Sequence, residues 1–146
     1  MSKEKSKTKI NFRKFYTSSG KLVLGGKNAE QNEMLVKQAG KNEIVLHTKA
    51  AGSPFVNIKG RASKQDIKEA ALFCAAYSRD WKKNKKDVEV HYFYGKDIFK
   101  EKEMPLGTFG VKKAKKTTAQ KKAIEEFIEL LKNNQRYSKG GKEVPK

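Results

Sequence analysis

The stretch NEIVLHTKAAGSPFVNIKG, residues 42–60, combines two short apolar runs with a turn of small residues. The runs, Ile44–His47 and Phe55–Ile58, are typical of β-strands in length and composition. The first run ends on His47, one of two histidines in the chain. The small-residue turn would let a phosphate or a ribose come near backbone N–H groups, and Ser53 would add a hydroxyl donor. We therefore expect a strand pair whose connecting turn can face a ligand.

Strand and helix patterns follow on both sides of this stretch. Residues 11–26 alternate around a Ser-Ser-Gly turn, which is typical of a β-hairpin. Asn28 is a suitable N-cap for a helix, with Gln31 in a capping-box-like position and Gly40 suited to position C′. The other predicted elements are a helix at 63–81 capped by Ser63, strands at 87–95 and 105–116, and a helix at 118–132.

These elements predict an α+β fold, a single compact domain with a mostly antiparallel sheet and about three helices. We expect the domain to span residues 11–133, between a basic flexible arm at 1–10 and a flexible tail at 134–146. The buried faces of the two later helices should carry Ile67, Ala70, Ala71, Cys74 and Ser78, and Ile124, Phe127, Ile128 and Leu131.

The charge balance points to a polyanionic partner. The 146 residues include 34 Lys and Arg against 16 Asp and Glu, a formal net charge of +18. Such an excess opposes compaction by self-repulsion, so nucleic acid is the first partner to consider and an anionic membrane surface the second. A lysine-rich protein from a salt- or heat-adapted cell is the alternative. No apolar run approaches membrane-spanning length, so we expect a cytoplasmic protein without a membrane partner.

Catalytic, metal and cofactor chemistry find little support in the sequence. Cys74 lies among alanines in a predicted helix, where a thiol is usually an inert apolar group, and as a single cysteine it excludes an intramolecular disulfide. His47 and His91 lie on separate predicted strands, and nothing local indicates that they meet. Cys and His are too few for a typical metal site, and no phosphate-binding glycine motif is present. We expect neither catalysis nor a metal nor a cofactor.

Two polar residues have both a structural and a functional interpretation. Asn32 falls on the apolar side of its helix with Leu35 and Val36, where its amide needs either a backbone partner or a ligand. His47 is either a satisfied, half-buried side chain or part of a ligand site beside the small-residue turn. Lys59 and Arg61, just beyond the second strand, would supply charge.

Aromatic residues alternate with basic ones in several segments, such as NFRKFY and RDWKKNKK. Lysine and arginine neutralise phosphates, and exposed aromatic rings can stack on unpaired bases. We expect one or two aromatic residues at the surface, because most aromatics in strands are core. The candidates are Phe15, Tyr16, Trp81, Tyr92 and Tyr94.

The order of these motifs resembles the NFACT-R domain family over roughly residues 12–116. The motifs that carry the resemblance are FYTSSGKLVLGGKNAEQNEMLVKQ, HTKAAGSPFVNIKG, EAALFCAAYSRDW and LGTFGVKK. The resemblance implies an RNA-binding module, with tRNA or ribosomal RNA and the large ribosomal subunit as partners in ribosome-associated quality control. The positions that it carries over are Asn28, Gln31, Asn32, Glu33, His47, Gly52, Ser53, Ser78, Gly107 and Thr108. With the basic residues, the predicted RNA-binding set adds Lys59, Arg61, Arg79, Lys112, Lys113, Lys115 and Lys116.

Large members of that family carry an N-terminal domain and a coiled coil, whereas we expect this sequence to resemble the small stand-alone form. An accessory or enzyme of tRNA modification is therefore the alternative function, and a protein-interaction domain on the ribosome is a third. The oligomeric state stays open. In the binding interpretation, His47, Ser53 and the helix beginning after Asn28 hold a phosphate–ribose segment. Glu33 would instead bind a ribose hydroxyl, His47 or a lysine.

Overall fold

The computed structural model describes residues 10–140, with side chains described as far as residue 133. Its elements are β1 (Arg13–Tyr16), β2 (Leu22–Gly25), α2 (Ala29–Gln38), β3 (Ile44–Thr48), β4 (Val56–Ile58), α3 (Lys64–Ala76), α4 (Arg79–Asn84), β5 (Val88–Tyr94), a 3-10 turn (Gly95–Asp97), β6 (Ile98–Phe99), β7 (Gly110–Val111), β8 (Lys115–Ala119) and α5 (Lys121–Gly140). The arm predicted at residues 1–10 lies outside the described residues, except for Ile10.

Six strands form one sheet in the order β1-β2-β4-β3-β5-β8, and every neighbouring pair is antiparallel. Strands β6 and β7 form a separate antiparallel ribbon. The predicted hairpin is β1 and β2, and the opening strand pair is β3 and β4. The expected α+β class with a mostly antiparallel sheet is confirmed. In the described part of the chain, α2, α3 and α5 are the longer helices and α4 is a short fourth.

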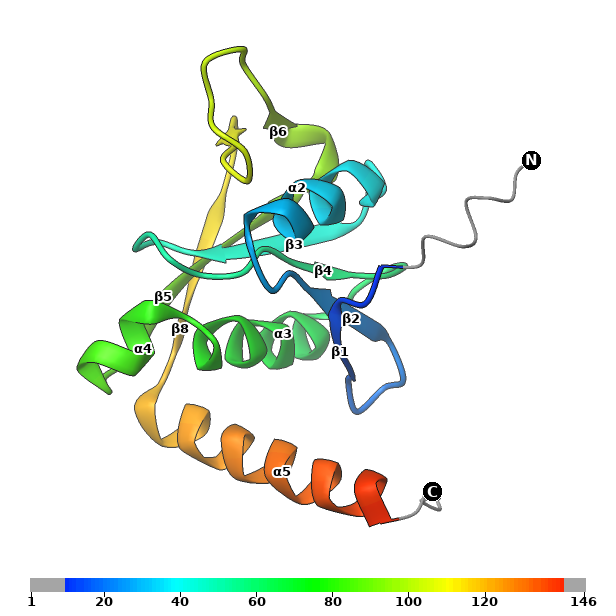
Figure 1. Ribbon diagram of the computed structural model, residues 1–146, viewed down its shortest axis with the longest axis vertical. Helices are drawn as coiled ribbons and strands as arrows, with labels where there is room; N and C mark the ends of the chain where they lie inside the picture. Colours follow the sequence, from blue (N-terminus) through cyan, green and yellow to red (C-terminus); the bar gives the residue numbers. More distant parts are fainter. Residues whose placement is uncertain (1–9, 141–146) are drawn as a thin grey trace.

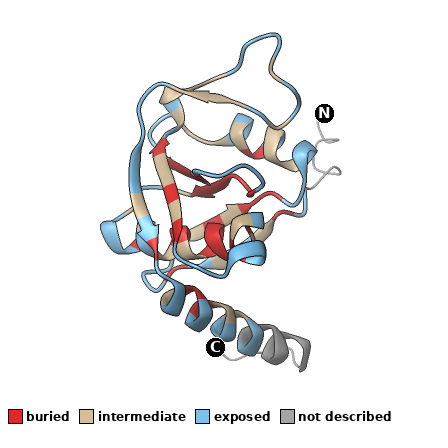
Figure 2. Ribbon diagram, turned by 90° about the vertical axis from the view of Figure 1, so that its left-hand side faces the viewer, coloured by how far each residue is buried: buried red, intermediate tan, exposed pale blue. Residues whose placement is uncertain are grey.

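The two faces of the sheet are covered by different elements. Figure 1 shows α2 and the β6–β7 ribbon above the sheet, with α3 and then α5 below it. The larger buried cluster joins the sheet to α3 and α5 through residues such as Leu46, Phe73 and Ile124. The smaller cluster joins it to α2 and consists of Phe12, Leu35, Val45, Phe55 and Phe93. Buried residues follow the sheet and the inner side of the helices in Figure 2.

Side-chain caps fix where the helices begin. Asn28 accepts a hydrogen bond from Gln31 N at 2.9 Å and so starts α2 where predicted. Ser63 and Asp66 form a reciprocal capping box at the start of α3. Asp66 also accepts a hydrogen bond from the Ser19 hydroxyl at 2.7 Å, which ties the β1–β2 turn to this helix.

Two predicted elements divide differently in the structure. The helix predicted at 63–81 stops after Ala76, because Ser78 caps the separate helix α4 by accepting a hydrogen bond from Trp81 N at 3.1 Å. Ser78 is buried, as expected, but it serves as the N-cap of α4 and not as part of a longer helix face. The strand predicted at 105–116 is a loop as far as Phe109, then the short β7, a turn and β8.

The C-terminal ends of α2 and α5 also differ in detail from expectation. Gly40 follows α2 without the positive φ of a helix-ending glycine, and its N–H donates to the Glu43 carboxylate at 2.9 Å instead. The backbone of α5 continues to Gly140, into the segment predicted as tail. Ile124 and Phe127 are buried, and Ile128 and Leu131 pack against the same cluster.

Candidate nucleic-acid interface

A cleft of about 800 Å³ opens beside the turn that follows β3. It is bounded by the start of α2, the loop between β3 and β4, the start of α4 and the loop before β7. Five cationic residues line it, namely Arg13, Lys27, Lys49, Arg79 and Lys82. None of the described residues that line this cleft is acidic. The cleft therefore favours an anionic ligand.

Asn32 fixes the inner end of the cleft. Its Oδ1 accepts a hydrogen bond from Phe55 N at 3.0 Å, and Gly26 N donates to Phe55 O at 3.1 Å. A Cβ at Gly26 would lie 2.1 Å from Asn32 Oδ1, so only glycine leaves room for this approach. The backbone-partner interpretation of Asn32 thus holds for the amide oxygen. Its amide nitrogen has no acceptor among the described residues, although the side chain lines the cleft.

The two histidines meet across the sheet, which the sequence did not indicate. His47 on β3 pairs with His91 on β5, and His91 pairs in turn with Lys116 on β8. Residues paired directly across neighbouring strands point to the same face. These three side chains therefore form a row from the cleft toward the β8 edge of the sheet. The neighbouring Lys115 lies on the opposite face.

The environment of His47 keeps its ring neutral. Burial lowers the pKa of His47, and His91 opposite lowers it further, against the opposing effect of the hydrogen bond to Thr48. Its Nδ1–H donates to Thr48 O at 2.8 Å, which leaves Nε2 as the acceptor nitrogen. The ring packs on Phe55 with 4.4 Å between ring centroids. His91 is held separately, by a 2.9 Å contact between its Nε2 and Glu89 Oε2.

The small-residue turn is held mostly by its own hydrogen bonds. The Ser53 hydroxyl is buried, accepts from Thr48 N at 3.1 Å and donates to Pro54 O at 3.0 Å. Gly52 has φ +91°, a conformation that favours glycine, and its carbonyl accepts from Arg79 N at 2.8 Å. Ser53 thus shapes the turn from inside, while Gly52 brings Arg79 to the cleft.

Glu33 holds the loop that forms the opposite wall. Its Oε1 accepts from Gly107 N at 2.7 Å and from Lys100 Nζ at 3.1 Å. The hydrogen bond from Gly107 lowers the pKa of Glu33, so the side chain is a carboxylate at neutral pH. Of the roles considered for Glu33, binding a lysine is the one that the geometry fits. Gly107 and Thr108 line the cleft, with Phe109 beside them.

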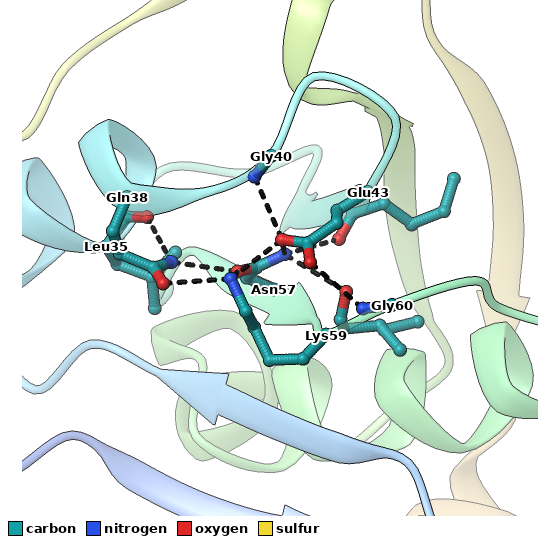
Figure 3. A network of polar contacts seen from close by, with 9 residues as sticks. Leu35, Gln38, Gly40, Glu43, Asn57, Lys59 and Gly60 are labelled. Atoms are coloured by element: carbon teal, nitrogen blue, oxygen red, sulfur yellow. Dashed lines mark hydrogen bonds and ion pairs between the residues drawn. The ribbon is translucent and has the colours of Figure 1, made fainter.

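Other predicted site residues lie away from the cleft. Lys59 Nζ forms an ion pair with Glu43 at 2.7 Å and also contacts Gln38 and Asn57, in the network of Figure 3. Arg61 lies near that network, and its backbone carbonyl accepts a hydrogen bond from Lys21 Nζ at 2.6 Å. Lys112 and Lys113 are exposed in the turn between β7 and β8.

The rest of the predicted set shapes or borders the cleft. Asn28 and Arg79 line it, while Gln31 supports the start of α2 by accepting from Lys27 N at 3.1 Å. Ser78 positions Arg79 by capping α4. The cleft therefore gathers Asn28, Asn32, His47, Gly52, Ser53 and Arg79, with Lys116 next to it in register.

Several cleft residues were not selected from the sequence. Arg13 places its guanidinium 4.1 Å from the centre of the Tyr77 ring and donates to Gly26 O at 3.1 Å. Lys27, Lys49 and Lys82 look like ordinary surface lysines in the sequence. Lys27 and Lys49 each adjoin a predicted site motif, and this position in the sequence could have identified them as site residues. Lys82 and Arg13 reach the cleft only through long-range packing, which the sequence does not show.

Of the aromatic candidates, two are strongly exposed, in line with the expected one or two. Tyr16 is 65% exposed and Tyr94 46%. Trp81 is buried, and Phe15 packs against Phe73 with 4.8 Å between ring centroids. Neither exposed tyrosine lines the cleft.

The described residues offer little for thiol, metal or membrane chemistry. Burial raises the pKa of the Cys74 thiol to about 12, so it remains protonated. No cluster of three or more metal-ligating side chains occurs between residues 10 and 133. In the described part of the chain, no helix has the length and apolar character needed to cross a bilayer.

Comparison with known families identifies the domain. The family described as the NFACT protein RNA binding domain matches residues 11–113. The chain belongs to this family. The matched region of this NFACT RNA-binding domain includes helix α2, the cleft and the β6–β7 ribbon. The resemblance seen in the sequence motifs is thereby confirmed.

One curated protein and one solved structure are similar to this chain. The archaeal Rqc2 homolog aRqcH of Methanocaldococcus jannaschii is 32% identical over 94 residues, which is 62% of this chain and 14% of that protein. This NFACT RNA-binding domain thus spans a small part of that relative's length. The C-terminal part of the fibronectin/fibrinogen-binding protein from Streptococcus suis shares the fold, with a TM-score of 0.71 at 22% identity, over 81% of this chain and 49% of that one.

Proposed function

We propose that the cleft binds structured RNA, with tRNA or ribosomal RNA as the target, and that the protein acts at the large ribosomal subunit in ribosome quality control. The observation that carries the proposal is a cleft whose described lining residues include five cations and no carboxylate, in a domain of an RNA-binding family. The relation to an archaeal Rqc2 homolog supports the ribosomal setting.

Binding begins with electrostatic capture of phosphates by the cations that line the cleft. A phosphate–ribose segment then docks between the start of α2 and the Gly52 turn. The helix N-terminus, marked by Asn28, adds a favourable dipole end for an anion. Arg79, which Gly52 holds in place, presents a planar guanidinium that can bind a phosphate with two parallel hydrogen bonds.

A pair of consecutive lysines on α4 tests whether the cleft is the site. Lys82 lines the cleft and Lys83 does not, although both are exposed and carry the same charge. We expect Lys82→Gln to weaken tRNA binding about 3-fold or more and to reduce the slope of log affinity against log salt by about one, and Lys83→Gln to change neither appreciably. Fluorescence anisotropy with labelled tRNA, single-stranded RNA and duplex DNA over a salt series measures both effects.

Comparing Lys82→Gln with Lys83→Gln separates binding in the cleft from general attraction between charges. If both variants weaken every nucleic acid equally, the cleft is not the site and the proposal fails. A preference for tRNA or ribosomal RNA fragments over duplex DNA supports the stated target. Equal affinity for the three would leave a generic polyanion binder and contradict the selectivity.

A role in RNA modification is the second candidate, because His47 and His91 face each other beside the cleft. A neutral His47 has the protonation state of a general base. This function predicts product formation on RNA and a His47→Ala variant that binds RNA but forms no product. A binding module predicts that the same variant loses affinity or selectivity, with no product formed by either protein.

A further inference from the structure

The cleft combines two surfaces that a phosphate site alone does not require. Its rim is cationic, but its inner wall is aromatic, with the partly exposed rings of His47, His91 and Phe109 over the buried Phe55 and Phe93. Placing a phosphate against such a wall would cost desolvation without a compensating partner. A planar, apolar group with polar edges fits that wall better.

The aromatic wall is built as one connected unit. Phe55 contacts His47 on one side, with 4.4 Å between ring centroids, and Phe109 on the other, with 5.5 Å and perpendicular planes. Lys100 Nζ lies 4.6 Å from the centre of the Phe109 ring and is itself held by Glu33. The positions of these rings are thus fixed before any ligand arrives, which lowers the entropic cost of stacking on them.

A polar group that lacks a partner lies at the same wall. The amide nitrogen of Asn32 has no acceptor among the described residues. An acceptor atom on the edge of a nucleobase can satisfy this donor. The volume of about 800 Å³ lies within the range of small-molecule sites, about 300–1,000 Å³.

We propose that the cleft takes a single unpaired nucleotide, with its base against the His47–His91–Phe109 wall and its phosphates on the cationic rim. This inference rests on the proposed RNA binding and deepens it. The stacked bases inside a continuous duplex cannot reach the wall, whereas a bulged, looped or terminal nucleotide can. The RNA recognised would be structured RNA that presents an unpaired nucleotide.

The test compares RNAs that differ in one base and in no phosphate. One RNA is a stem with a single bulged adenosine, and the other is the same stem with an abasic ribose at that position. A fully paired stem and a free adenosine monophosphate complete the set. We expect the bulged RNA to bind about 10-fold more tightly than the abasic one. Their salt dependence should be the same, because the phosphates are unchanged.

A conservative variant identifies the aromatic contribution. Phe109→Leu keeps an apolar side chain of similar size but removes the aromatic face, so it should bind the bulged and the abasic RNA alike. Tyr94→Leu, at an exposed ring outside the cleft, should keep the 10-fold difference. A 2-aminopurine at the bulge should lose fluorescence on binding the natural protein and much less on binding Phe109→Leu.

The outcomes of these binding experiments separate RNA binding in general from the unpaired-nucleotide site. If none of the RNAs binds, RNA binding itself fails. If the bulged, abasic and paired RNAs bind alike, RNA binding stands and the unpaired-nucleotide site is overturned. If adenosine monophosphate alone displaces the bulged RNA at low micromolar concentration, the site is a free-nucleotide site and the assignment to RNA is overturned.

Discussion

Glu43 shows how much one side chain can link in this fold. Its carboxylate accepts hydrogen bonds from Lys59 Nζ at 2.7 Å and from Gly40 N and Gly60 N at 2.9 Å each. Partial burial by itself would raise the pKa of Glu43, but these hydrogen bonds outweigh it and lower the pKa to about 2. The end of α2 is thereby joined to the residues that follow β4.

The depressed pKa makes Glu43 a source of acid sensitivity. Because the folded pKa is below the unfolded value, this stabilisation is fully present above about pH 5 and is lost as the pH falls toward 2. We expect Glu43→Gln to lower the free energy of unfolding at pH 7 by about 2 kcal/mol, and the difference from the natural protein to shrink below about pH 4. Urea unfolding between pH 7 and pH 3 measures this difference.

Glu125 provides the matched control for this experiment. It is exposed on α5, so Glu125→Gln makes the same change in charge without removing that network. A pH-independent difference for Glu43→Gln, or an equal loss of stability for Glu125→Gln, would contradict the role assigned to Glu43. The charge of Lys59 is visible in the sequence, but the identity of its partner is not. The partner, Glu43, lies in the bend before β3, so the sequence could not show that Lys59 is neutralised within the fold.

Among the elements, the β6–β7 ribbon depends on α2 for its position. Glu33 on α2 accepts hydrogen bonds from Gly107 and from Lys100, and Lys100 also donates to Pro105 O at 2.7 Å and Thr108 O at 2.9 Å. The loop that bears Phe109 is thus held to the start of the helix through one carboxylate. Removing this carboxylate should loosen the wall of the cleft without unfolding the sheet.

We expect Glu33→Ala to speed hydrogen exchange at the Gly107 amide about 10-fold, because that N–H loses its acceptor. Amide exchange followed by NMR measures this rate. Glu30→Ala removes an exposed carboxylate from the first turn of the same helix and should leave Gly107 unchanged. Unaltered exchange at Gly107 in the Glu33 variant would show that the loop is held by other contacts.

Elements with local signals could be predicted, and those with long-range causes could not. Asn28 and Ser63 are caps that act within three residues, so the starts of α2 and α3 were correct. For Ser78, the sequence predicts a position on a helix face and not at a helix start, because the apolar pattern continues through it. The meeting of His47 with His91 follows from strand order in the sheet, which no local pattern shows.

For the whole molecule, the net charge of +18 acts on stability and on binding in opposite directions. Salt screens repulsion between like charges in the folded protein and also screens attraction to phosphate. Raising NaCl from about 20 mM to about 200 mM should therefore raise the thermal midpoint by a few degrees while weakening RNA binding. Calorimetry and anisotropy measure these two quantities on the same samples.

A variant with fewer exposed charges provides the control. Lys83, Lys113 and Lys132 are exposed and do not line the cleft, so replacing all three with Gln lowers the net charge without changing the proposed site. This variant should show a weaker salt dependence of its thermal midpoint. A midpoint that falls with salt in the natural protein would mean that attractive ion pairs outweigh the excess positive charge.

Strand β8 lies at one edge of the sheet. It pairs with β5 on one side and ends the sheet on the other, and its sequence begins with the exposed Lys115 and Lys116. The free edge of a sheet is a template on which a second chain can add a strand, and lysines along it oppose that addition by repulsion and by the cost of burying them. The lysines of this edge should therefore protect the protein against aggregation, whether or not RNA is bound.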